Sequence, residues 1–290
     1  MKKIAILSYY SGVNNRGVES WSKNVQDHVK GYQIDILNGS LALNPFYWIK
    51  YDLIIPTNGR FQSVLARLLS WTLRKPLVIF SHSGPGADDK WNLLCCPNTF
   101  VCFTRAQAVW AARFKLPWTK IEVVPHAVDI NTFTPGTKPK KPVVLCVAAN
   151  HPAKRVKLVS SAIKLLPGVK LRIVGPGQPE QVPFEKMPEI YKNANVFCFV
   201  PQPWEAFGLV FLEAMASNLP VVTSNDPIRR EIIGNAGKFV SHPENPAELA
   251  AVIRTALSRD WGNLPRSQAE KFSWDKITQK YDQLIRGHHR

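Results

Sequence analysis

Two glutamates eight positions apart, Glu205 and Glu213, lie in a stretch whose residue types suit the binding of a polar ligand. The apolar run 196–200 precedes them and predicts a short buried parallel strand. From Gly208 onward the apolar residues follow helical spacing, so Glu205 is expected in the loop after the strand and Glu213 inside the next helix. Ligands of open α/β sheets bind at the carboxyl edge of the strands, which is where Glu205 is placed.

The start of this predicted helix has the features of an anion site. Backbone N–H groups in the first turn of a helix lack partners within the helix, so those of Phe207, Gly208 and Leu209 are expected to face an anion. Gly208 has no side chain to hinder a close approach. Carboxylates accept strong hydrogen bonds from hydroxyl groups, so the two glutamates suit a ligand that carries hydroxyl groups.

Glu205 and Glu213 match the E-x7-E pair of retaining GT-B glycosyltransferases, and the surrounding residues resemble glycosyltransferase family 4, the glycosyl transferases group 1. The resemblance covers nearly the whole chain and is strongest over residues 143–240. It implies an α/β fold of the GT-B type, in which two Rossmann-like domains face each other across a cleft. It also implies that Glu213 binds the ribose hydroxyls of a nucleotide-sugar donor and that Glu205 binds the donor sugar.

The elements that must position these residues can be followed along the chain. Strand-like and helix-like segments alternate, which favours parallel sheets covered on both faces. The segment 133–142 is rich in Pro, Gly and Lys without an apolar period, so it is interpreted as a linker. We therefore expect two domains, 1–135 and 136–271. The resemblance implies that the first is the acceptor-side domain, that the second binds the donor, and that the helix in 272–290 packs back on the first domain.

The resemblance assigns a basic group to the donor diphosphate. Lys154 matches the family lysine and is expected to take part in catalysis with Glu205, although a solvated loop lysine remains the alternative. Ala149 stands where the family has an arginine, and Arg155 or His151 could take over its task.

Other positions match the family motifs less closely. His82 follows a predicted strand at the place of the first-domain histidine that reaches the donor sugar, and an ordinary loop histidine is the alternative. For His126, packing between the domains is favoured over catalysis. Arg16 replaces the first glycine of the family turn Gly-Gly-x-Glu. The glycines expected to line the donor or phosphate path are Gly12 and Gly17 in the first loop and Gly175 and Gly177 in a later turn.

The composition limits the class of protein. The 290 residues carry a net charge of +16 spread over both halves, which implies partners with negative charge, such as nucleotide diphosphates or anionic lipid surfaces. No motif for nucleic-acid binding accompanies the charge, and nucleic acid is not the expected partner. The five cysteines show neither metal-ligand spacing nor a disulfide framework, and no Asp-x-Asp motif is present, so a reduced cytoplasmic protein without a metal cofactor is expected. No apolar run approaches the ~20 residues that span a bilayer.

Arg60, Arg67 and Arg74 recur every seven residues on a predicted helix, with Trp71 nearby. This spacing places them along one helix face. That face suits either the surface of an anionic membrane or plain solvation, and both interpretations remain open. Lipid-linked acceptors are common in the family, and a peripheral position on the inner face of the membrane is the corresponding localisation.

Taken together, the residues and the resemblance predict a retaining, metal-independent glycosyltransferase that moves a sugar from a nucleoside diphosphate to a hydroxyl acceptor, lipid-linked or part of a cell-envelope glycan. Two alternatives stay open. One is a GT-B epimerase or phosphorylase, and the other is a non-catalytic protein that binds nucleotide sugars or polyanions.

Overall fold

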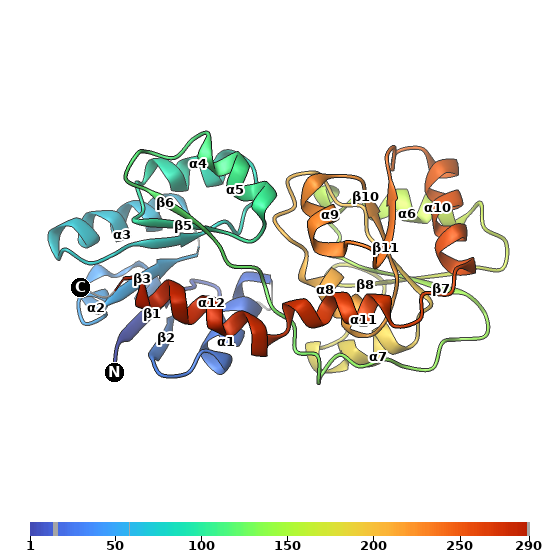
Figure 1. Ribbon diagram of the computed structural model, residues 1–290, viewed down its shortest axis with the longest axis horizontal. Helices are drawn as coiled ribbons and strands as arrows, with labels where there is room; N and C mark the ends of the chain where they lie inside the picture. Colours follow the sequence, from blue (N-terminus) through green and yellow to red (C-terminus); the bar gives the residue numbers. More distant parts are fainter. Residues whose placement is uncertain (14–16, 58, 289–290) are drawn as a thin grey trace. The chain divides into compact units, whose positions relative to one another are not determined.

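A computed structural model describes residues 1–13, 17–57 and 59–288. The chain divides into two compact units, each an α/β structure with parallel strands (Figure 1). Unit 1 comprises Met1–His126 together with Trp274–Arg290, and unit 2 comprises Ala127–Ser273.

Unit 1 is built on two three-stranded parallel sheets. The first has the strand order β2-β1-β3 and the second β4-β5-β6, and a parallel bridge between Ile54 and Leu77 joins them edge to edge. Strands β1, β3, β4 and β5 are largely apolar and buried, which is expected for strands covered on both faces, whereas β2 and β6 carry charged residues and are partly exposed. The bounds are β1 (Lys3–Leu7), β2 (Gln33–Leu37), β3 (Leu53–Pro56), β4 (Val78–Phe80), β5 (Thr99–Cys102) and β6 (Lys120–Val123), with helices α1 (Gly17–His28), α2 (Pro45–Trp48), α3 (Arg60–Thr72), α4 (Ala87–Leu94) and α5 (Arg105–Ala112).

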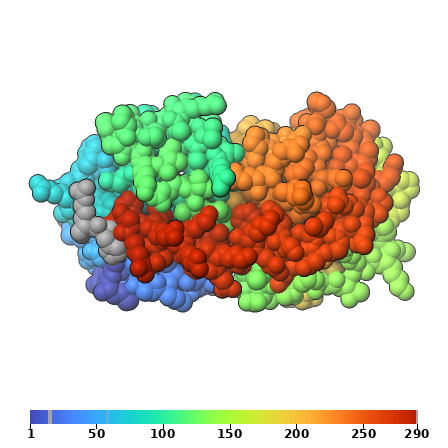
Figure 2. Space-filling model, viewed as in Figure 1, coloured from blue at the N-terminus to red at the C-terminus, as the bar shows by residue number. Residues whose placement is uncertain are grey.

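The C-terminal helix α12 (Trp274–Arg286) belongs to unit 1. Its inner face is held by polar contacts as well as packing. The indole N–H of Trp21 donates a hydrogen bond of 2.7 Å to the hydroxyl of Tyr281, and Tyr32 donates one of 2.6 Å to Asp282. Its other face stays on the surface, as Figure 2 shows in red, and carries mostly polar and charged side chains.

Unit 2 contains one five-stranded parallel sheet with the order β11-β10-β9-β7-β8. Strands β7 and β9 lie at its centre and are fully buried, so the loops at their carboxyl ends are neighbours. The strands are β7 (Val143–Val147), β8 (Lys170–Val174), β9 (Val196–Cys198), β10 (Val221–Ser224) and β11 (Gly237–Val240), and the helices are α6 (Val156–Ile163), α7 (Met187–Lys192), α8 (Leu209–Ala216), α9 (Pro227–Ile233), α10 (Pro246–Ser258) and α11 (Leu264–Ala269).

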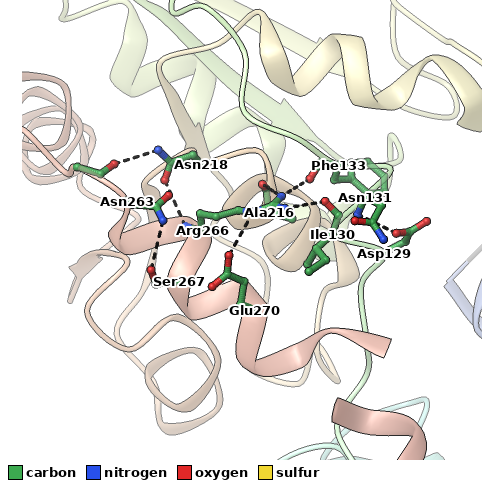
Figure 3. Close-up of polar contacts among 11 residues, drawn as sticks. Asp129, Ile130, Asn131, Phe133, Ala216, Asn218, Asn263, Arg266, Ser267 and Glu270 are labelled. Carbon is green, nitrogen blue, oxygen red and sulfur yellow. Dashed lines mark hydrogen bonds and ion pairs between the residues drawn. The ribbon is translucent and has the colours of Figure 1, made fainter. Parts of the chain in front are cut away.

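The division between the units falls at 126/127, before the Pro/Gly/Lys segment that suggested a boundary at 135/136. The reason is a set of contacts made by Arg266 in α11, drawn in Figure 3. Its guanidinium donates hydrogen bonds to the carbonyl oxygens of Phe133 (2.6 Å), Ala216 (2.6 Å) and Ile130 (2.8 Å). Because these bonds fix residues 130–133 to helices α8 and α11, this part of the expected linker is an ordered part of unit 2.

Helix α3 corrects one expectation about the surface. Arg67 is buried, with 8% of its surface exposed, whereas the Arg60 side chain is 76% exposed, so Arg60, Arg67 and Arg74 do not form one exposed basic face. Local periodicity placed the three residues together, but Arg67 is drawn inward by Asn98. Within the described ranges, no helix combines the length and the apolar character that crossing a membrane requires.

Candidate functional site

The predicted residues Lys154 and Glu205 meet at the carboxyl edge of the sheet in unit 2. Lys154 ends the short turn 152–154 after β7, and Glu205 lies in the loop between β9 and α8. The ammonium group of Lys154 is 2.6 Å from a carboxylate oxygen of Glu205, with the side chains 31% and 19% exposed. A backbone hydrogen bond of 3.0 Å from Gln202 to Ala153 joins the same two loops. The site therefore presents a paired cation and anion that ligand groups can still reach.

Arg229 in α9 holds the loop that contains Glu205, and the sequence analysis assigned no role to it. Its side chain is fully buried and donates hydrogen bonds of 2.8 Å to the carbonyl oxygens of Gln202 and Glu205. Asp226, 3.3 Å away, supplies a counter-charge. The signal in the sequence was the basic pair Arg229-Arg230, but nothing in a local pattern shows which of the two is buried.

The N-terminus of α8 is the predicted anion site, and its role stays a prediction. Gly208 precedes the helix with a φ of +84°, and a Cβ atom there would lie 2.7 Å from the ring of Phe211. No side chain of a described residue caps the helix, so the N–H group of Leu209 is available to a ligand by helix geometry. Phe207 is 1% exposed, and its ring faces that of Phe272. Its side chain is thus part of the core, and a role of Phe207 in donor binding stays a prediction.

Glu213 lies in the second turn of α8 and keeps some exposure. The hydroxyl of Tyr191, in α7, donates a 2.6 Å hydrogen bond to its carboxyl group. Burial raises the pKa of Glu213 to about 7, although the bond from Tyr191 opposes this shift. The carboxyl group is therefore poised to change charge near neutral pH. Tyr191 could not be found from the sequence because it lies 22 positions from its partner.

The predicted glycines of the later turn pack against the loop that follows β7. A Cβ atom on Gly175 would lie 2.4 Å from the carbonyl oxygen of Ala148, and one on Gly177 would lie 3.2 Å from Asn150. The two turns are further tied by a 2.8 Å hydrogen bond from the Asn150 N–H to the carbonyl oxygen of Pro176. The turn 175–177 can approach the loop after β7 this closely because Gly175 and Gly177 have no side chains.

The two candidates for replacing the family arginine are both engaged elsewhere. Arg155 forms an ion pair with Glu244, in the loop before α10. His151 accepts a hydrogen bond from the N–H of Ala153 through its Nδ1 atom, at 3.2 Å. Neither contact involves the Lys154–Glu205 pair, so a substitute role for Arg155 or His151 remains a prediction.

The other predicted site residues belong to unit 1. His82 follows β4 and lies among aromatic rings, 4.6 Å from that of Trp21 and 5.2 Å from that of Phe103. Its Nε2 atom is buried without a hydrogen-bond partner among the described residues, and burial lowers the pKa of the imidazole to about 3. His82 is therefore neutral at physiological pH. His126 stacks on Phe103 at 3.8 Å within unit 1, and packing of His126 between the domains stays a prediction.

The first loop is described at its two ends. Gly12 has a φ of +85°, which glycine adopts without strain, and Gly17 is the first residue of α1. Arg16, the departure from the family turn, lies outside the described residues. Among the residues that the structure covers, no group of three or more His, Cys, Asp or Glu side chains is arranged to hold a metal ion.

Comparison with known proteins places this arrangement in a family context. The family described as glycosyl transferases group 1 matches residues 179–272, which contain Glu205, Glu213 and Arg229. The O-antigen chain mannosyltransferase B of Escherichia coli is 37% identical over 102 residues, covering 33% of this chain and 26% of that protein. The sulfoquinovosyl transferase SQD2 of Arabidopsis thaliana is 30% identical over 170 residues, covering 49% and 33%. The matched part thus spans about a quarter to a third of these relatives.

A solved structure agrees over a greater length. The Anabaena protein Alr3699/HepE, solved in complex with UDP and glucose, has a TM-score of 0.80 and 16% identity, covering 99% of this chain and 100% of that one. At this identity the similarity concerns the fold, and it confirms the predicted α/β fold of the GT-B type. The predicted resemblance to glycosyl transferases group 1 is confirmed as well. That the two domains face each other across a cleft stays a prediction.

Proposed function

From a chain whose residues 179–272 carry the pattern of glycosyl transferases group 1, we infer a retaining, metal-independent glycosyltransferase that uses a nucleoside-diphosphate sugar. The observation that carries this proposal is the Lys154–Glu205 contact of 2.6 Å at the carboxyl edge of the unit 2 sheet. One cation, one carboxylate and an open helix N-terminus are the groups that a sugar diphosphate needs.

Each part of the donor has a partner in this proposal. Lys154 and the N–H groups at the start of α8 bind the diphosphate, because both offer positive potential without bulk. Glu205 then accepts hydrogen bonds from the donor sugar, and Glu213 accepts them from the ribose. The Anabaena structure contains UDP and glucose, so UDP-glucose is the first donor to test.

In the transfer step, the bond between the anomeric carbon and the diphosphate oxygen breaks, and a bond from that carbon to the acceptor hydroxyl forms on the same face. The acceptor proton passes to the leaving phosphate oxygen. Lys154 stabilises the negative charge that develops on the diphosphate. Neutral His82 contributes a hydrogen-bonding imidazole on the acceptor side and does not act as a cationic acid, because burial keeps its pKa low.

The acceptor in this proposal is a hydroxyl group of a lipid-linked or cell-envelope glycan, and the reaction takes place on the cytoplasmic side of a membrane. Relatives named as an O-antigen chain mannosyltransferase and a sulfoquinovosyl transferase support a search among such acceptors.

The test is calorimetric titration with UDP-, GDP- and ADP-sugars without added metal, followed by transfer assays. Lys154→Ala should lower kcat/KM by roughly 10²–10³-fold, the usual effect of removing one group that stabilises a developing charge. Its effect on stability should stay within about 1 kcal/mol, since a partly exposed ion pair contributes little. Lys157→Ala, an exposed lysine of α6, is the matched control. Unchanged transfer by the Lys154 variant would refute the assignment.

A non-catalytic donor-binding protein is the second candidate, and Ala149 at the position of the family arginine favours it. This candidate predicts micromolar donor binding that is lost in Glu213→Ala, without turnover of any acceptor. A GT-B epimerase or phosphorylase differs from both, because it would consume the donor without an acceptor or only with inorganic phosphate.

A further inference from the structure

A basic pocket of about 610 Å³ lies in unit 1 at the amino ends of strands β4, β5 and β6. In a parallel sheet this edge is opposite the carboxyl edge that carries His82. The pocket is lined by the positively charged or titratable side chains of Arg67, Arg74, Lys75, Lys120 and His288 and by the rings of Trp71 and Trp118. We call it the Arg67 pocket.

The guanidinium of Arg67 is the most informative group in this pocket. The residue is 8% exposed, and its Nη1 atom donates a hydrogen bond of 3.2 Å to Asn98. Its Nε atom is buried without a hydrogen-bond partner, and no described carboxylate forms an ion pair with the side chain. The ring of Trp71 lies 4.6 Å from the guanidinium carbon. A buried cation without a counter-ion is unfavourable, so an anion that enters the pocket would gain a strong partner.

The neighbouring cations add to this positive potential. Arg74 is exposed and, like Arg67, forms no ion pair within the described part of the chain. Lys75 donates hydrogen bonds to backbone carbonyl oxygens, including that of Tyr51 at 2.7 Å. Because these partners are neutral, no contacting carboxylate of a described residue balances its positive charge. Lys120 is paired with Glu122 at 2.6 Å. The other nearby acid, Asp52, acts on Lys75 at longer range and accepts a hydrogen bond from the Lys3 N–H. The pocket therefore keeps an excess of positive charge.

An apolar groove of about 280 Å³ adjoins the pocket and shares Arg67 and Trp71 with it. Its apolar rim is unusually exposed for a folded protein. Leu68 is 52% exposed, Trp71 59% and Leu94 62%. Exposed apolar side chains beside cations match the boundary between lipid headgroups and hydrocarbon, where tryptophan and basic side chains are favoured.

We propose that the Arg67 pocket binds the phosphate of an anionic membrane lipid. Arg67, Arg74 and Lys75 hold the phosphate, while the exposed side chains of the groove rest against the hydrocarbon. The apolar rim points to a lipid and not to free phosphate as the source of this group. The proposal does not depend on the transferase activity, because the pocket lies at the other edge of the unit 1 sheet.

The test is co-sedimentation of the full chain with phosphatidylcholine vesicles that contain phosphatidic acid. Arg74→Asn removes one pocket cation and suits the positive φ of this residue, which is +52°. Arg113→Asn removes an exposed cation of unit 1 outside the pocket and serves as the control. If the protein is attracted to the vesicle surface only by its overall positive charge, either variant should lose vesicle affinity by about fivefold, at ~1 kcal/mol per basic residue. If the lipid phosphate binds in the pocket, Arg74→Asn alone should lower vesicle affinity by tenfold or more.

Three further measurements make the outcome decisive. Trp71→Ala should also weaken vesicle binding, and Arg67→Gln should do so provided that its thermal unfolding shows a folded protein. Millimolar pyrophosphate should displace the protein from the vesicles if the phosphate is what the pocket recognises. Equal losses of vesicle affinity for Arg74→Asn and Arg113→Asn would refute specific binding in the Arg67 pocket. Binding of pyrophosphate without any binding to vesicles would refute a lipid as the ligand.

Discussion

Arg229 contacts Glu205 through the backbone and not through the carboxylate. Its guanidinium donates a 2.8 Å hydrogen bond to the carbonyl oxygen of Glu205, while the carboxylate of the same residue pairs with Lys154. A buried arginine thus fixes the loop and leaves the acidic group directed at the site. The position of Glu205 therefore depends on a residue that contacts none of the proposed ligand groups.

Replacing Arg229 should loosen this loop and destabilise unit 2. Arg229→Met leaves two backbone carbonyl oxygens and Asp226 without their buried partner, and breaking such a buried pair costs about 3–5 kcal/mol. Urea denaturation of the variant measures this loss. Arg230→Gln is the control, because Arg230 is exposed and should change stability by less than about 0.5 kcal/mol. Similar midpoints for the two variants would contradict the proposed role of Arg229.

Glu213 should make stability depend on pH. Its pKa is raised to about 7 in the folded protein, above the ordinary value of 4.5 for a glutamate. Between these two values the folded state holds more protons than the unfolded state, so the free energy of unfolding falls as pH rises. The predicted fall is roughly 3 kcal/mol between pH 4 and pH 8. Chemical denaturation across this range should show it. Glu213→Gln, which cannot ionise, should remove this contribution and leave the one from Asp89, whose pKa burial also raises to about 7.

The same carboxyl group should couple donor binding to protons. In the proposed function, ribose hydroxyls donate to Glu213 and favour its ionised form, so donor affinity should rise with pH up to about 7. Below that pH, binding should release a proton. Calorimetry in two buffers with different heats of ionisation measures this release. Equal apparent binding enthalpies in both buffers at pH 6 would mean that no proton is released, and would refute the contact between Glu213 and the ribose.

Gly208 should tolerate no side chain, for a reason that a second glycine can isolate. Gly208 and Gly168 have similar φ values of +84° and +79°, but an added Cβ atom is 2.7 Å from the Phe211 ring at Gly208 and meets nothing within 4 Å at Gly168. Both alanine variants should lose about 1–2 kcal/mol from backbone strain. Gly208→Ala should lose roughly a further 1–3 kcal/mol of unfolding free energy, because the added methyl group overpacks the space beside Phe211. Equal losses in thermal denaturation would show that the Phe211 ring moves aside freely.

Much of the fold follows from local sequence. The strand predicted over 196–200 contains β9 (Val196–Cys198), and the helix predicted after Gly208 is α8 (Leu209–Ala216), because an apolar run followed by helical spacing leaves few alternatives. Helix α5 could have been found as well, since Thr104 and Gln107 form a capping box at its start. Strand-end positions also indicated where Lys154 and Glu205 belong.

The contact partners of the site residues could not be predicted from local sequence patterns. Tyr191 and Arg229 contact Glu213 and the Glu205 loop only after strands and helices from different parts of the chain have packed. The burial of Arg67 is decided in the same way, by Asn98, 31 positions along the chain. Periodicity reports which residues share a helix face, but it cannot report which neighbour that face will meet.

The chain enters and leaves unit 2 at adjacent points. The N–H of Val128 donates a 2.9 Å hydrogen bond to the carbonyl oxygen of Phe272, and Val128 and Ser273 form a parallel bridge. A segment with neighbouring ends can be cut out of one gene and inserted into another as a cassette. Unit 2 is thus suited to exchange between relatives. Under the proposed function, a chimaera joined at these two positions is expected to acquire a new donor and keep the old acceptor.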